Sequence, residues 1–189
     1  MVNLDDKCSR HFTWRQLIEC GETWERLAAA GTPCWDMPMQ EATWSGLALV
    51  AETILDPVVA EFGPVEMTYC FSPPSLFRHI GRRIAPKLDQ HAGSELNRLG
   101  ELICRRQGQA VDFRVPKVTS SDVARFIGAT LPFDRLYYFG DDRALHVSAG
   151  PAESRLAYSM LRGNGGALVP RRIVELSMIQ RDPVHVAPG

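Results

Sequence analysis

The feature that most constrains the fold is a carboxylate at the centre of an apolar strand, Asp112. The segment around it alternates, so Val111, Phe113 and Val115 would face one side of a strand and Asp112 the other. A half-buried aspartate needs a metal ion, an arginine or several N–H donors as its partner. The segment therefore predicts a strand that lies beside a polar group from elsewhere in the chain.

Two histidines are candidates for that partner. His91 lies upstream in the segment 89–93, and His146 lies downstream in an alternating, strand-like run, 145–148. Two histidines and one aspartate make a three-ligand set that leaves zinc one position for water. The working hypothesis is a zinc site made by His91, Asp112 and His146. The same residues are also compatible with an ion-paired aspartate and two ordinary histidines.

Composition excludes several classes of function. The chain has 189 residues, of which 45% are hydrophobic, and a net charge of −1. A core of ordinary size is expected, and no global field favours nucleic acid or an anionic membrane. The five cysteines form no CxxC pair, so neither a disulfide framework nor a cysteine zinc knuckle is indicated. No signal peptide is evident and the apolar runs are too short to cross a bilayer, so we expect a cytoplasmic protein with no membrane partner.

The order of the predicted elements is typical of an α+β fold. A capping box at Thr13 and Gln16 predicts a short first helix. The strongest helical period runs over 40–62, with Pro57 expected to kink or split it. Strands are predicted over 65–69, 135–139 and 144–148, and a helix after Thr119. Beyond Gly150 we expect a helix or strand over 156–161, a turn over 163–166, a strand over 169–178 and a mobile tail over 181–189.

Read in order, these segments resemble the zinc D-Ala-D-Ala carboxypeptidase family, which shares its fold with the hedgehog signalling domain. The similarity runs from about Phe12 to Gly150. It rests on five short matches: His11-Phe12-Thr13 with Leu17, Leu55-Asp56-Pro57, Phe62-Gly63-Pro64, Gly108-Gln109-Ala110-Val111-Asp112-Phe113, and Phe133-Asp134-Arg135-Leu136 followed by Leu145-His146-Val147-Ser148.

The resemblance implies a zinc-dependent hydrolase of an amide or peptide bond. The implied fold is a single α+β domain with a small antiparallel sheet and flanking helices, with residues 1–150 as the zinc domain and 151–189 as an extension. In the family the first histidine ligand precedes the motif's glycine by three residues, where this chain has Arg105. His91 is the expected replacement, separated from the rest of the motif by an insertion. The alternative is a non-catalytic metal-binding or interaction module on the same fold.

Other roles follow from the same comparison. The family's acidic residue before the last histidine is missing, and Asp142, with Asp141 in reserve, is the expected catalytic carboxylate. Substrate contacts are expected from Arg105, Arg114 and Tyr138. The family's substrate-binding arginine is replaced by Ser72, so a small intracellular peptide or amide is a more suitable substrate than a D-Ala-D-Ala terminus.

Overall fold

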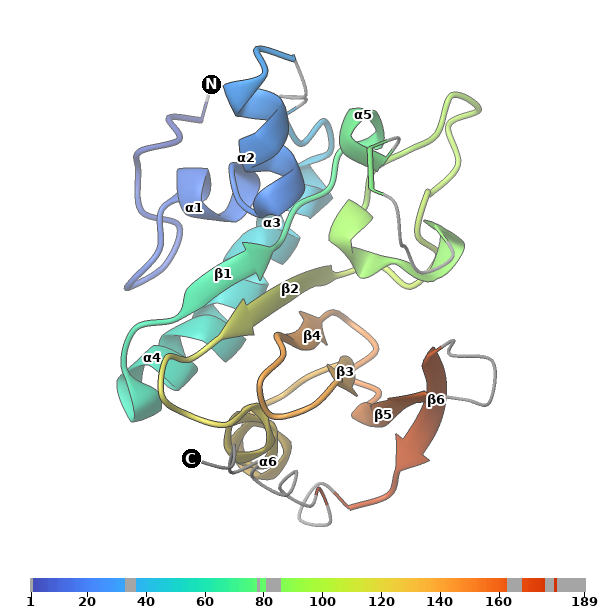
Figure 1. The fold of residues 1–189 in the computed structure, drawn as a ribbon. Helices are drawn as coiled ribbons and strands as arrows, with labels where there is room; N and C mark the ends of the chain where they lie inside the picture. Colours follow the sequence, from blue (N-terminus) through green and yellow to red (C-terminus); the bar gives the residue numbers. More distant parts are fainter. Residues whose placement is uncertain are drawn as a thin grey trace.

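The chain forms one α+β domain built around a six-stranded sheet (Figure 1). The computed structural model describes residues 2–32, 37–77, 79–80, 86–162, 168–175 and 179. Neighbouring strands follow the order β1-β2-β4-β3-β5-β6. Their bounds are β1 (Glu66–Tyr69), β2 (Gln109–Arg114), β3 (Arg135–Tyr138), β4 (Leu145–Ala149), β5 (Leu156–Arg162) and β6 (Leu168–Ile173).

The sheet contains both parallel and antiparallel pairs, so the prediction of a small antiparallel sheet is wrong. Strand β3 pairs with β4 in antiparallel fashion on one side and with β5 in parallel fashion on the other. Strand β4 already fills the other edge of β3, so the chain leaving β4 crosses to the free edge and adds β5 there. Strands β5 and β6 thus continue the same sheet beyond residue 150. The predicted turn over 163–166 and the tail over 181–189 lie outside the described residues.

Helices and short turns surround the sheet. They are α1 (Trp14–Ile18), α2 (Glu22–Ala29), α3 (Glu41–Val50), η1 (Ala51–Leu55), α4 (Asp56–Phe62), α5 (Pro74–Phe77), η2 (Pro86–Leu88), η3 (Gln90–Ala92) and α6 (Ser120–Thr130). The predicted capping box is present at the start of α1, and the Thr119 side chain caps α6. No helix of the described part of the chain is long and apolar enough to cross a membrane.

The core lies between the sheet and one long helical rod. In Figure 1, α3, η1 and α4 run as a single rod across β1 and β2. Val111, Phe113 and Val115 of the β2 segment are all buried in the main apolar cluster, as the alternation predicted. Asp112 therefore points to the opposite face, which is where the polar groups gather.

The interruption that the sequence indicated at Pro57 is present, because the α-helix gives way to a different turn there. Residues 51–55 form a π-helical turn, and α4 begins after it at Asp56, with Pro57 in its first turn. Proline has no N–H to donate and its ring clashes with the preceding turn in a regular α-helix. A wider turn relieves this conflict and keeps the apolar face of the rod on the sheet.

Candidate metal centre

Three side chains that are far apart in the sequence meet on the face of the sheet opposite the rod. Asp112 Oδ1 lies 2.7 Å from His146 Nδ1 and 3.2 Å from His91 Nε2. The two histidine nitrogens are 3.2 Å apart. The potential ligand atoms of all three residues lie within 4.8 Å of one another. The cluster expected from the sequence is therefore formed, and we call it the triad.

Strand register places two members of the triad. Asp112 on β2 and His146 on β4 are direct cross-strand partners, so their side chains point to the same face. Gly108 lets β2 enter the sheet this close to β4. Its φ is +76°, and a Cβ there would lie 2.2 Å from the Ala149 carbonyl oxygen. Gly108 of the sequence motif is thus needed for the backbone conformation and for the close approach of the two strands.

His91 comes from outside the sheet, on the short turn η3, and is held at three points. Its Nδ1 lies 2.7 Å from the Cys70 carbonyl oxygen, which can only accept, so Nδ1 carries the hydrogen. Its backbone N–H donates to Asp89 Oδ1, and its carbonyl oxygen accepts from the Ser72 N–H. These contacts fix the ring so that Nε2 faces the other two members of the triad.

The electrostatics of the triad favour an anionic aspartate. Burial alone would raise the pKa of Asp112, but the charge and hydrogen bonds of His91 and His146 outweigh it and hold that pKa well below its usual value. Burial alone would lower the pKa of His91, but the Asp112 carboxylate, with help from Asp89 and the Cys70 carbonyl, raises it. Without a metal, the added proton on His91 allows Nε2 to donate to Asp112.

The donor set fits a divalent metal ion of the zinc type. It consists of two imidazole nitrogens and one carboxylate oxygen, which suit zinc and similar transition metals. The hydrogen bond from His91 Nδ1 to a backbone carbonyl is the outer-shell contact that metal-ligating histidines usually make. In the described part of the chain no fourth His, Cys, Asp or Glu joins the group. Such a site would keep one position open.

The triad opens into a cavity of about 580 Å³, a size typical of small-molecule sites. Several apolar side chains line it, together with the carboxylates of Glu22 and Asp89. The complete lining is Glu22, Thr23, Thr68, Tyr69, Ile80, Asp89, His91, Asp112, Phe139, His146, Met160 and Leu168. Burial raises the pKa of Tyr69 far above its usual value, so its hydroxyl keeps its proton.

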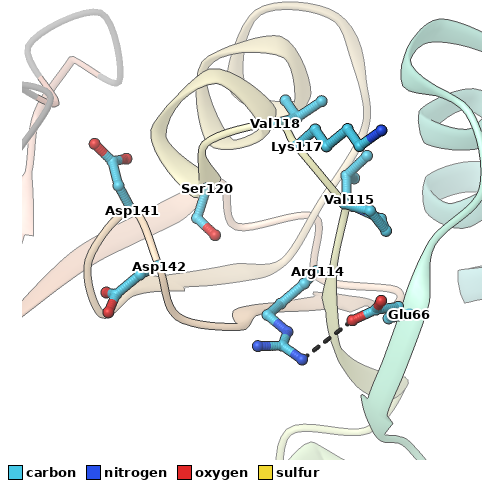
Figure 2. Close-up of a pocket in the computed structure, with 9 residues that line it drawn as sticks. Glu66, Arg114, Val115, Lys117, Val118, Ser120, Asp141 and Asp142 are labelled. Carbon is cyan, nitrogen blue, oxygen red and sulfur yellow. Dashed lines mark hydrogen bonds and ion pairs between the residues drawn. The ribbon is translucent and has the colours of Figure 1, made fainter.

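Asp141 and Asp142, the expected catalytic carboxylates, lie in a different pocket. Figure 2 shows them near Ser120 at the start of α6. Asp141 Oδ1 accepts hydrogen bonds from the Ser121 N–H and the Tyr138 hydroxyl, each at 3.0 Å. Tyr138 is buried in the core, on the strand face opposite Tyr137, so this contact draws Asp141 away from the triad. The structure therefore does not bring the two aspartates to the triad.

The expected substrate-binding residues also lie outside the triad cavity. Arg114 is exposed and pairs with Glu66 at 3.1 Å in the pocket of Figure 2. Arg105 is exposed, and its backbone N–H donates to the Lys87 carbonyl oxygen. The Tyr138 hydroxyl donates its hydrogen bond to Asp141 in the other pocket.

Glu22, Tyr69 and Asp89 line the cavity, although the sequence did not predict them as site residues. A signal for Asp89 exists, because an aspartate side chain commonly accepts the backbone N–H two residues further on, which here is that of His91. Nothing in the local sequence of Glu22 or Tyr69 relates them to the triad, since only the packing of α2 and β1 beside η3 brings them there.

Comparisons with models of protein families, with curated proteins and with solved structures find no match to this chain.

Proposed function

We propose that this protein is a zinc-dependent hydrolase of an amide or peptide bond, on a fold of the hedgehog and D-Ala-D-Ala carboxypeptidase type. The observation that carries the proposal is the convergence of His91, Asp112 and His146 at a cavity of about 580 Å³. Three protein ligands with an open position are typical of catalytic zinc, whereas structural zinc usually has four. The cytoplasmic location stays an expectation from the sequence.

The residues of the triad would hold the ion, and each has a distinct task. A bound zinc ion supplies a Lewis acid that polarises a carbonyl group and makes water more acidic. Asp112 provides the anionic ligand, and its lowered pKa keeps it deprotonated at neutral pH. His91 is oriented by the Cys70 carbonyl, so Nε2 is the nitrogen available to a ligand.

Hydrolysis also requires a group that moves a proton from water to the leaving amine. Besides the ligand Asp112, two carboxylates line the cavity, and we assign this step to one of them, Glu22 or Asp89. Asp89 is nearly fully buried and already accepts the His91 N–H, whereas Glu22 lies on the exposed first turn of α2. Tyr69 also lines the cavity, but its hydroxyl is fully buried, so we assign it no contact with the substrate.

A terminal D-Ala-D-Ala carboxylate is a poor match for this site. Ser72, at the place of the family's arginine, is fully buried and its backbone N–H donates to the His91 carbonyl oxygen. A hydroxyl does not replace the paired, charge-assisted hydrogen bonds of a guanidinium. Losing such a contact costs roughly 1.5–3 kcal/mol, about ten- to a hundred-fold in binding.

The test is hydrolysis by the zinc-loaded protein. We expect cleavage of some members of a panel of small peptides and N-acyl amines, with little release of D-Ala from a D-Ala-D-Ala-terminated pentapeptide. Asp112→Ala should abolish cleavage. Glu22→Gln and Asp89→Asn keep side-chain size and discriminate between the two carboxylates, because only the residue that moves the proton should lower kcat by a factor of about a hundred or more. Efficient release of D-Ala would contradict the substrate argument.

A non-catalytic metal-binding module is the second candidate. The placement of Asp141 and Asp142 in a separate pocket favours it, because the expected catalytic acid is then absent from the cavity. The two candidates differ in one measurable property. A hydrolase site exchanges a ligand at its open position, so cobalt substituted for zinc should change its visible spectrum when a small hydroxamate is added. A closed module should show no change.

A further inference from the structure

On the face of the sheet that carries the triad, aromatic side chains form a row across the neighbouring strands, starting at His146. His146 is the cross-strand partner of Tyr137 on β3, and Tyr137 is the partner of Tyr158 on β5. The Tyr137 ring meets the edge of His146 at 5.0 Å and stacks on Tyr158 at 5.4 Å with an interplanar angle of 17°. The Tyr137 hydroxyl accepts a hydrogen bond from Arg106 at 3.2 Å, which holds the ring in place.

Strands β5 and β6 then contribute to a wall of the triad cavity. Met160 lies two residues after Tyr158 and therefore points to the same face of the sheet. Its partner on β6 is Pro170, and Leu168 lies on the same face two residues before it. Met160 and Leu168 line the cavity, together with Phe139. Leu168 is 49% exposed, so the wall presents apolar surface to whatever enters.

We propose that the paired strands β5 and β6 form the specificity wall of the site, which binds an apolar side chain of the substrate next to the bond that is hydrolysed. This inference rests on the proposed function, because the triad sets the position of that bond. The occupant is part of the substrate, since the wall and the triad line the same cavity. An aliphatic or aromatic group there covers Met160, Leu168 and Phe139 and removes their surface from water.

The chain offers a matched control on the same strand. Val169 is 50% exposed, close to the 49% of its neighbour Leu168, but its side chain alternates to the opposite face and does not line the cavity. A glutamate at either position adds the same charge to β6 at the same exposure. Only the change at Leu168 places that charge beside the bound apolar group.

The experiment measures binding of straight-chain alkyl hydroxamates to the zinc-loaded protein by calorimetry. Every member of the series binds the ion through the same headgroup, so chain length reports on burial of the alkyl group in the cavity, and the variants show whether the wall covers it. Each methylene that is buried strengthens binding about fourfold. We expect hexanohydroxamate to bind at least about tenfold more tightly than acetohydroxamate. Leu168→Glu and Met160→Glu should remove most of that ratio, and Val169→Glu should keep it.

The outcomes separate this inference from the proposed function. If zinc is bound but no hydroxamate binds, the open metal site is refuted, and the wall with it. If all hydroxamates bind equally, the site stands and the wall is refuted. An equal loss of the ratio in Val169→Glu also refutes it. If thermal unfolding shows that the glutamate variants do not fold, the milder variants Leu168→Ala and Met160→Ala replace them. An unchanged binding ratio in both alanine variants then refutes the wall.

Discussion

His91 is the residue on which the site depends most. At the place in the sequence where the resembled family has its first ligand, this chain has Arg105, which is exposed and lies outside the triad. His91 takes part instead, with Nε2 at 3.2 Å from both Asp112 Oδ1 and His146 Nδ1. Its position on a turn rather than a strand is compensated by hydrogen bonds to Cys70, Asp89 and Ser72. We therefore expect His91 to contribute as much to metal binding as Asp112 and His146 do.

The first prediction concerns metal content. Purified protein should contain about one zinc per chain, and alanine at His91, Asp112 or His146 should each remove most of it, because a three-ligand site loses a third of its donors. Metal analysis after dialysis measures this. The exposed His79 supplies the control, since His79→Ala should retain the ion. Full retention of zinc in His91→Ala would show that this residue is not a ligand.

At the scale of elements, a buried polar contact ties the turn η3 to the sheet. Ser148 lies two residues after His146 on β4, and its hydroxyl donates to Gln90 Oε1 at 2.8 Å. The amide of Gln90 donates in turn to Asp134 Oδ2 at 2.8 Å and to the Gln107 carbonyl oxygen. Because Gln90 precedes His91, this network fixes the distance between the turn and the strand that carries the third ligand.

The second prediction tests that contact. Ser148→Ala removes the hydroxyl and should lower zinc affinity about tenfold, because residues behind the ligands orient them. It should also cost about 1 kcal/mol of unfolding free energy. Ser120→Ala is the control, since this buried serine donates to the Arg143 carbonyl oxygen away from η3. Competition with a chelator measures affinity, and urea denaturation measures stability. Equal affinity loss in both variants would show a general effect of destabilisation.

The sequence predicted elements that have a clear local signal, but it did not predict how those elements pair and pack with one another. The alternation around Asp112, the cap at Thr13 and the strands over 135–139 and 144–148 depend on neighbouring residues, and the structure confirms all of them. The parallel pairing of β5 with β3 depends on a choice between sheet edges that no local pattern encodes. For the same reason the sequence indicated Asp142 near the triad, although the contact of Tyr138 with Asp141 turns that loop toward α6.

At the scale of the whole molecule, the triad connects three parts of the chain. Its members come from η3, β2 and β4, so they join a turn outside the sheet to two neighbouring strands within it. A ligand that binds only the folded state stabilises it by about 2.7 kcal/mol when its concentration is a hundred times its dissociation constant. Zinc should therefore stabilise the entire fold, and the size of that effect should depend on pH.

The last prediction is that metal-free and zinc-loaded protein respond to pH in opposite directions. The pKa of His91 in the folded protein is raised above its usual 6.5, so the folded state holds more protons than the unfolded state just above pH 6.5. The stabilising effect of this proton is complete below pH 6.5 and is lost as pH rises through the raised pKa. Metal-free protein should therefore become less stable between pH 6 and pH 8. Zinc competes with the same proton, so zinc-loaded protein should become more stable over that range.

Urea denaturation at fixed free zinc, and in its absence with a chelator, measures both slopes. The metal-free slope should flatten in Asp112→Asn, because the neutral amide no longer raises the pKa of His91. It should persist in His79→Asn, which changes an exposed histidine outside the triad. The lowered pKa of Asp112 acts in a separate window, since its contribution is present above pH 3.8 and is lost only as pH falls below that value. Parallel slopes with and without zinc would mean that proton and metal do not share a site, and the triad would then be an ion-paired aspartate with two structural histidines.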